Sequence, residues 1–249
     1  METVLSNELN TIIRGEMSMK TIGLIGGMSW ESSIIYYRII NELVREKLGG
    51  MHSCKSLMYS TDFAEIEKLQ HQGKWDKLAE MMINISLNLK NAGADCIVVC
   101  TNTMHKLADA VENTIDIPLI HIADATAKPI LKQGLKKVGL LGTKFTMEED
   151  FYKGRLTSKH NIEVIIPEPD EREIIHSVIY QELVIGKIAD SSREKYNKII
   201  EGMYRNGAEG IILGCTEIAL LVHEKDSHIP LFDTTQIHAQ AAVEFSLKA

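Results

Sequence analysis

The stretch DIPLIHIADATA at residues 116–127 is matched by HIPLFDTTQIHA at residues 228–239, which begins 112 positions later. Three further pairs of segments match, and they occur in the same order in both halves of the chain, at offsets of 114 to 116 residues. They pair LIGG with LLGT (24–27 and 140–143), AGAD with NGAE (92–95 and 206–209), and Thr101-Asn102-Thr103 with Cys215-Thr216-Glu217. Ordered matches at a nearly constant offset indicate an internal duplication. The chain is therefore expected to contain two similar halves of about 115 residues each.

Short apolar runs alternate with longer amphipathic stretches along the chain. The expected strands are 21–27, 56–60, 95–100, 117–122, 138–143, 163–167, 210–215 and 229–233. The expected helices include 34–44, 74–92, 171–186 and 191–206. This alternation is typical of α/β proteins, in which helices cover both faces of a parallel sheet. We expect two pseudo-symmetric α/β domains, the first formed by residues 19–120 with 232–249 and the second by residues 121–231.

Composition and charge argue against several classes of protein. The 249 residues include 27 Lys and Arg against 34 Asp and Glu, so the net charge of −7 disfavours a general nucleic-acid binder. No apolar run reaches the roughly 20 residues that span a bilayer, so we expect no membrane segment. Four cysteines without CxxC spacing indicate reduced thiols and a cytoplasmic protein. Residues 1–18 lack the pattern of a secretory signal and are expected to be an appendage to the fold.

The duplication predicts where a ligand would bind, because ligands of parallel α/β folds lie beyond the carboxyl ends of the strands. If the halves face each other, the loops 101–105 and 215–218 approach one inter-domain cleft from opposite sides. Cys215 ends a buried strand, where backbone N–H groups would lower the thiol pKa and favour a thiolate. The repeat places Thr101 opposite Cys215 and leaves Cys100 in the core. The alternative for Cys215 is an inert buried thiol.

Four motifs resemble those of the cofactor-independent aspartate/glutamate racemases. They are GLIGGMSWES (23–32), TNTMH (101–105), GLLGT (139–143) and GCTE (214–217), and the resemblance covers residues 19–249. The family carries Cys-Asn-Thr-x-His in the first half and Gly-Cys-Thr in the second, so Thr101 stands where a cysteine is usual. The match is similar to enterobacterial amino-acid racemases specific for L-aspartate and L-glutamate. The resemblance implies a homodimer and a reaction without a cofactor.

In that family two acid–base groups flank the substrate α-carbon, because a planar carbanion must be addressed from both faces to be inverted. The resemblance implies that Cys215 removes the proton of the L-enantiomer. Thr101 would serve weakly on the D face, since an alcohol is a very poor base but can donate a proton. We therefore expect an asymmetric racemase that acts chiefly on L-aspartate and L-glutamate.

The expected substrate contacts lie at strand ends over the cleft. They are Met28, Ser29, Asn102, Thr103, Thr143, Thr146, Thr216 and Glu217, although each threonine could instead cap a helix. Aspartate-specific relatives use an arginine after the second strand and a lysine on a second-half helix. Here the first loop offers Gln70 as a neutral donor, and the helix offers Tyr180 with Val184 near the position of the lysine. These departures favour glutamate or a broader range over strict aspartate preference.

One further residue is a candidate for supporting the catalytic groups, and the sequence also bears on whether a cofactor binds. His105 follows the first motif and is expected to orient a catalytic group or to cap a helix. The other histidines form no HxH or HxxxH cluster, and GLIGG lacks the third glycine of a dinucleotide fingerprint, so we expect neither a metal nor NAD.

Two alternatives to the racemase stay open. One is an arylmalonate-type decarboxylase, which keeps only the second-half cysteine and would release CO₂ from a malonate. The other is a non-catalytic amino-acid sensor, which would bind without exchange of the α-hydrogen.

Overall fold

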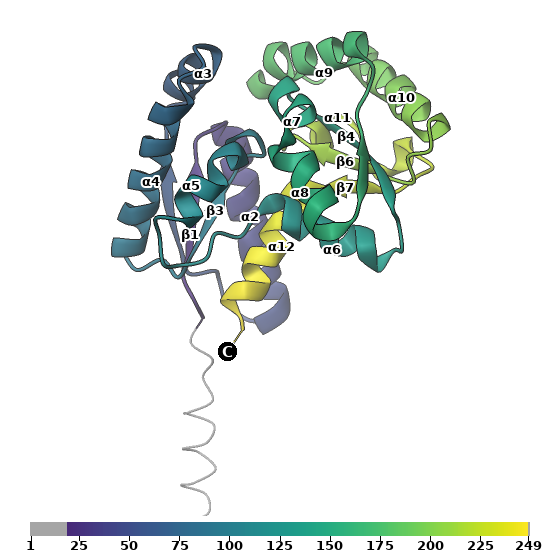
Figure 1. Ribbon diagram of the computed structural model, residues 1–249. Coiled ribbons are helices and arrows are strands. Elements are labelled where there is room, and N and C mark those ends of the chain that lie inside the picture. The colour runs from purple at the N-terminus through teal and green to yellow at the C-terminus, as the bar shows by residue number, and fades with distance from the viewer. Residues whose placement is uncertain (1–18, 249) are drawn as a thin grey trace, which may run out of the picture.

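The computed structural model describes residues 19–248 and contains two parallel β-sheets flanked by helices (Figure 1). The predicted α/β fold class is therefore confirmed. The first sheet has the order β2-β1-β3 and the second the order β5-β4-β6-β7. No helix within residues 19–248 is long and apolar enough to cross a membrane. Residues 1–18, expected to be an appendage, lie outside the described part of the chain.

Nine helices and strands precede β4 in the described region, and the last of them, α6, falls in the second expected domain. They are β1 (Ile22–Gly26), α2 (Trp30–Leu48), β2 (Ser56–Ser60), α3 (Phe63–His71), α4 (Trp75–Asn91), β3 (Cys96–Val99), the 3-10 helix η1 (Thr103–Leu107), α5 (Ala108–Glu112) and α6 (Ile122–Lys132).

The remaining chain runs from β4 to the carboxyl end. Its elements are β4 (Lys137–Gly142), α7 (Lys144–Glu148), α8 (Asp150–His160), β5 (Glu163–Ile165), α9 (Pro169–Gln181), η2 (Leu183–Ile185), α10 (Asp190–Arg205), β6 (Ile211–Gly214), α11 (Ile218–Leu221), η3 (Glu224–Asp226), β7 (Leu231–Asp233) and α12 (Thr234–Ser246).

The two sheets repeat one topology, which agrees with the duplication found in the sequence. The central strands β1 and β4 each pair in parallel with the next strand of their half and with a later one, β3 or β6. In the second half β7 adds a fourth strand beside β6. The strand predicted at 117–122 is wrong as a full strand, since only Leu119 forms a bridge, with Ile97 of β3. The pairing stops there because His121 already caps α6.

The final helix connects the two halves. Helix α12, yellow in Figure 1, packs against α2 and also against α6. The Tyr36 hydroxyl of α2 is hydrogen-bonded to Nδ1 of His238 at 2.9 Å. The return of the chain to the first half therefore occurs as predicted, whereas the domain boundaries within residues 19–249 stay a prediction.

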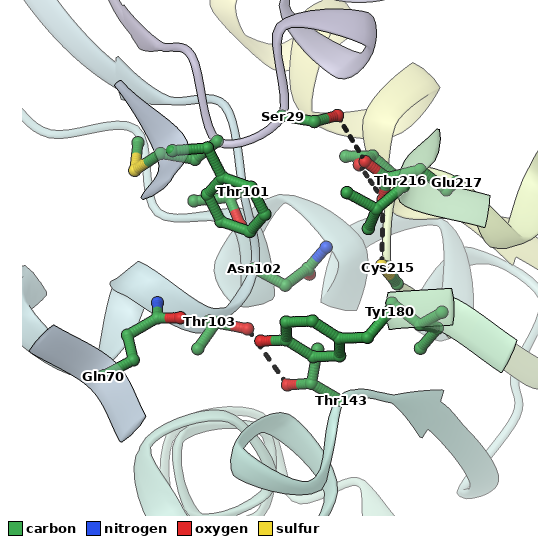
Figure 2. Close-up of a pocket in the computed structure, with 15 residues that line it drawn as sticks. Ser29, Gln70, Thr101, Asn102, Thr103, Thr143, Tyr180, Cys215, Thr216 and Glu217 are labelled. Atoms are coloured by element: carbon green, nitrogen blue, oxygen red, sulfur yellow. Dashed lines mark hydrogen bonds between the residues drawn. The ribbon is translucent and has the colours of Figure 1, made fainter. Parts of the chain in front are cut away.

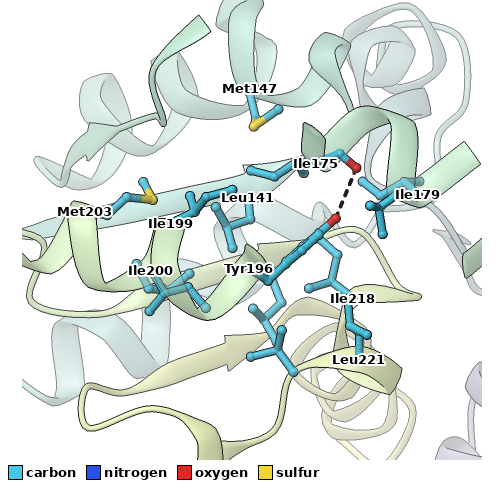
Figure 3. Packing of buried hydrophobic residues seen from close by; sticks show 14 of the residues in the cluster. Leu141, Met147, Ile175, Ile179, Tyr196, Ile199, Ile200, Met203, Ile218 and Leu221 are labelled. Carbon is cyan, nitrogen blue, oxygen red and sulfur yellow. Dashed lines mark hydrogen bonds between the residues drawn. The ribbon is translucent and has the colours of Figure 1, made fainter. Parts of the chain in front are cut away.

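Buried apolar side chains form the layers between sheet and helices. On α4, Leu78, Met82, Ile85 and Leu89 recur on one face and are all buried, as the helical spacing indicates. In the second half a cluster surrounds the fully buried Tyr196, whose hydroxyl donates to the carbonyl of Ile175 at 3.1 Å (Figure 3). Each half therefore has its own core, and the strand ends between them hold the polar side chains described next.

Candidate active site

A cavity lies where the carboxyl ends of β1, β3, β4 and β6 meet (Figure 2). Its volume is about 30 Å³, which is room for little more than one water molecule. It is lined by Met28, Ser29, Phe63, Gln70, Thr101, Asn102, Thr103, Thr143, Ile179, Tyr180, Val184, Gly214, Cys215, Thr216 and Glu217. The structure therefore brings the two residues expected to face each other, Thr101 and Cys215, to the wall of one cavity between the halves.

Cys215 follows β6 directly and is hydrogen-bonded to its neighbour in the same loop. The thiol donates to Oε2 of Glu217 at 2.9 Å. Burial raises the pKa of the Cys215 thiol well above its usual value, and the negative charge of Glu217 raises it further. The sequence-based expectation of a lowered thiol pKa is therefore wrong. The backbone N–H groups of Thr216 and Glu217 act in the expected direction, but burial and the carboxylate outweigh them.

Glu217 is a buried carboxylate that joins the two halves. Its Oε2 accepts hydrogen bonds from the Thr216 hydroxyl at 2.7 Å and from Cys215. Its Oε1 accepts one from the Ser29 hydroxyl at 2.8 Å, and the Ser32 hydroxyl lies 3.3 Å away. Ser29 caps α2, so these contacts cross from the first half to the second. Of the residues expected to contact substrate, Ser29, Thr216 and Glu217 are therefore bonded to one another.

Thr101 follows β3, and His105 holds its backbone from behind. The main-chain N–H of Ile122 donates to Nε2 of His105 at 3.2 Å, so Nδ1 carries the proton. Nδ1 then donates to the carbonyl oxygen of Thr101 at 2.8 Å. Burial lowers the pKa of His105 well below its usual value, and the nearby His121 lowers it further. His105 does not line the cavity and contacts Thr101 only through the backbone, which fits an orienting role.

Three threonine hydroxyls meet on the floor of the site. Thr103 Oγ1 lies 3.0 Å from Thr143 Oγ1, which in turn lies 3.2 Å from Thr146 Oγ1. Thr143 also caps α7, so this residue is both a helix cap and part of the cavity wall. Thr146 is fully buried behind the other two and does not line the cavity. Thr146 therefore supports Thr103 and Thr143 in this structure, and its contact with substrate stays a prediction.

Two buried acceptors in the cavity wall have no hydrogen-bond partner among the described residues. They are Oε1 of Gln70 and Oδ1 of Asn102. The amide nitrogen of Gln70 lies 3.2 Å from the sulfur of Met104, and that of Asn102 donates to Thr234 at 3.1 Å. Buried polar atoms are normally paired, so these two oxygens are suited to receive N–H donors of a ligand.

Among the residues 19–248 that line the cavity, none is a lysine, arginine or histidine. This agrees with the lack of an arginine in the loop after the second strand, and with Val184 in the wall, near the position where aspartate-specific relatives carry a lysine. Burial raises the pKa of Tyr180, so its phenol remains a neutral donor at the site. Within residues 19–248, no group of three or more His, Cys, Asp and Glu side chains is arranged to hold a metal ion.

Sequence reasoning missed three residues of this region. Phe63 and Ile179 line the cavity from α3 and α9, and Ser32 approaches Glu217 from α2. The two apolar residues carry no motif. Ser32 lies inside the GLIGGMSWES motif, three residues after Ser29, a spacing that places both side chains at the start of one helix.

Comparisons with known proteins match most of the chain to racemases and their homologues. A family model described as Asp/Glu/hydantoin racemase matches residues 25–242. The crystal structure of an Asp/Glu racemase candidate from Yersinia pestis is 55% identical, with a TM-score of 0.87, and the match covers 92% of this chain and 100% of that one. An aspartate racemase homologue from Pyrococcus horikoshii is 36% identical, with a TM-score of 0.81 and the same coverage. The broad specificity amino-acid racemase RacX of Bacillus subtilis is 22% identical over 234 residues, which are 89% of this chain and 96% of RacX.

Proposed function

The chain belongs to the Asp/Glu/hydantoin racemase family and is an amino-acid racemase, and from this premise we propose that it acts chiefly on L-glutamate and L-aspartate. The reaction is proton removal and return at the α-carbon, without a cofactor. The observation that carries the proposal is the position of Thr101 and Cys215, which come from equivalent strand ends of the two halves and line one cavity. An α-carbon between them has one acid–base group on each face.

The two groups have unequal strength. A catalyst cannot shift the equilibrium between the enantiomers, so this asymmetry appears in the kinetics and in the exchange of the α-hydrogen. Cys215 as a thiolate removes the α-proton of the L-enantiomer. Thr101 donates a proton to the opposite face, directly or through water, and is too weak a base to remove the α-proton of the D-enantiomer efficiently. His105 fixes the backbone of Thr101 and so keeps its hydroxyl at the cavity.

The polar wall suggests how the substrate is held. The unpaired oxygens of Gln70 and Asn102 would accept hydrogen bonds from the α-ammonium group. Neutral donors, namely the Tyr180 phenol and the threonine hydroxyls at 103 and 143, would bind carboxylate oxygens. Because no cationic side chain of the described part of the chain lines the cavity, this arrangement supports glutamate or a broader range of substrates over strict aspartate preference.

Hydrogen exchange at the α-carbon tests the unequal pair. In D₂O, the α-hydrogen of L-glutamate and L-aspartate is expected to exchange faster than inversion occurs, with little exchange from the D-enantiomers. Proton NMR of each enantiomer gives both rates. Equal exchange from both enantiomers would contradict the role of Thr101. The release of CO₂ from a malonate, or binding without exchange, would instead favour the decarboxylase or the sensor.

Substitution of Thr101 provides the matched pair of variants. Thr101→Cys supplies a stronger base on the D face, so exchange from the D-enantiomers is expected to rise at least tenfold and to approach that of the L-enantiomers. Thr101→Ala removes the hydroxyl and is expected to slow inversion more than exchange from the L-enantiomer. An unchanged ratio of D to L exchange in Thr101→Cys would show that position 101 does not serve the D face.

We also propose that the protein is a cytoplasmic homodimer, as the resemblance implies. Three large side chains along α2, Trp30, Ile34 and Tyr37, are between 54% and 61% exposed and form an apolar stripe suited to contact a second copy. Sedimentation equilibrium is expected to give twice the chain mass of 27.9 kDa. A mass equal to one chain across micromolar concentrations would contradict the dimer.

A further inference from the structure

A second cavity lies between the two halves of the chain, on the far side of His105 from the Thr101 loop. Its volume is about 270 Å³, close to the lower end of ligand pockets, which is about 300 Å³. One wall comes from η1 and α5 and the other from α8, two regions that Figure 1 shows on either side of the molecule's centre. This cavity shares no lining residue with the cavity that holds Thr101 and Cys215, so the two are separate sites.

His121 supplies a buried N–H donor to the second cavity. The residue is 4% exposed, and its Nδ1 accepts a hydrogen bond from the main-chain N–H of Ala123 at 3.2 Å, so the ring proton lies on Nε2. Among residues 19–248, no atom accepts a hydrogen bond from this Nε2. Burial lowers the pKa of His121 to about 3, so the ring is a neutral donor near pH 7. A buried donor of this kind normally has a partner, which here is left for a ligand.

Arg155 supplies a second set of donors from α8. Its Nε and Nη2 donate to the two carboxylate oxygens of Asp124, at 2.8 and 2.7 Å. Its Nη1 lies 3.7 Å from Asp109 and 3.8 Å from Glu112, distances that are too long for hydrogen bonds. The side chain is only 11% exposed. The N–H groups on Nη1 are therefore held at the cavity wall without a close acceptor.

The charged side chains around these donors are arranged by depth. Lys159 lies on the exposed part of α8 and forms no ion pair within residues 19–248. Asp109 and Asp150 also line the cavity, but their side chains are 88% and 89% exposed, so water screens their charge. The unpaired donors of the cavity therefore belong to its least exposed side chains, whereas the two carboxylates lie at its edge.

We propose that this cavity binds a small phosphate monoester. The phosphoryl oxygens accept hydrogen bonds from Nε2 of His121 and Nη1 of Arg155, and Lys159 offsets part of the charge. A phosphoryl group fits better than a carboxylate because it carries about −1.5 to −2 charges at pH 7 and presents three acceptor oxygens to donors that come from different elements. Hydroxyl groups on the body of the ester then donate to Asp109 and Asp150 at the edge. This site does not depend on the proposed racemase function.

Calorimetric titration of the full chain with glycerol 3-phosphate, at pH 7.5 and low ionic strength, tests the site. We expect binding with a Kd below about 1 mM. Inorganic phosphate is expected to bind several-fold more weakly, because it lacks the hydroxyl groups, and glycerol is expected not to bind. If none of the three binds up to 10-fold above that concentration, the proposal is wrong. If inorganic phosphate binds as tightly as the ester, the free anion is the ligand and the assignment to an ester is wrong.

Lys159→Glu locates the bound phosphoryl group. It reverses a charge at an exposed position that no described ion pair uses, and it is expected to weaken the binding of glycerol 3-phosphate about tenfold. Lys198→Glu makes the same change on the exposed face of α10 and is the matched control, which should bind as the wild type does. Equal affinity in Lys159→Glu and the wild type would place the anion elsewhere and overturn the proposal. The readout is binding and not turnover, so a failure of the racemase proposal would leave it unchanged.

Discussion

Cys215→Ser is expected to lower both racemisation and α-hydrogen exchange of L-glutamate by a factor on the order of 1,000 or more. A serine hydroxyl is a far weaker acid than a thiol, so the negatively charged base that removes the α-proton is almost never formed. The substitution is nearly isosteric, and a serine can still donate to Glu217 as the thiol does. Binding of the amino acid, measured by calorimetry, is therefore expected to change far less than kcat.

Cys100→Ala is the matched control for Cys215→Ser. Cys100 is a second thiol at the carboxyl end of a strand, one residue before Thr101, but it is fully buried among the core residues of the first half. Its loss is expected to lower folding stability while the activity per folded molecule stays within a few-fold of the wild type. If Cys215→Ser keeps substantial activity, the sulfur at 215 is not the base on the L face. If Cys100→Ala abolishes activity in folded protein, the assignment of the two thiols is reversed.

The folded protein is expected to lose much of its stability as the pH falls from 7.5 to 5, before its carboxylates titrate. Three histidines, His105, His121 and His238, are at most 4% exposed and pack ring against ring, with centroid distances of 4.7 and 5.5 Å from His105 to the other two. Burial lowers the pKa of His121 to about 3 and that of His238 to about 4, and holds that of His105 well below its usual value. All three are therefore neutral in the folded protein.

Proton linkage explains why the free energy of unfolding falls as the pH is lowered. In the unfolded chain a histidine titrates near pH 6.5, so the unfolded state binds more protons as the pH falls below that value. The stability that these side chains contribute is fully present above pH 6.5 and is lost as the pH falls toward their folded-state pKa values. For each histidine that stays neutral in the fold, the free energy of unfolding falls by about 1.4 kcal/mol for every pH unit below 6.5. The three together therefore lower it by about 6 kcal/mol at pH 5. That loss is comparable to the total stability of many domains, about 5–15 kcal/mol.

Urea unfolding followed by circular dichroism between pH 7.5 and 5 measures the slope of the free energy of unfolding against pH. His121→Asn is the sharpest variant, because His121 caps α6 through its side chain and asparagine is also a favoured cap. It is expected to reduce the slope by about a third and leave the helix start intact. His52→Gln, at an exposed position, is the control and should keep the full slope. Stability that is flat from pH 7.5 to 5 would show that these histidines do not remain neutral in the fold.

The sequence alone predicted the frame of the molecule. The repeat between 116–127 and 228–239 indicated two related halves, and the parallel order of the two sheets bears this out. The alternation of apolar runs located β1, β3, β4 and β6 to within a residue or two, because strands buried on both faces appear as continuous apolar segments. The ends of parallel strands lie on one edge, so the placement of Thr101 and Cys215 in one cleft also followed from sequence.

Tertiary structure decided the electrostatics of that cleft. A helix N-terminus favours a thiolate when it is considered alone, and the sequence shows no more than that local arrangement around Cys215. The thiol pKa is raised instead because burial depends on both halves together and because Glu217 turns back onto the sulfur. The bond from Ser29 to Glu217 spans 188 residues, and no periodicity or motif reports a contact over that distance. The motif residues that line the cavity were therefore named from sequence, whereas Phe63 and Ile179 and the protonation of the thiol depended on neighbours that only the folded chain supplies.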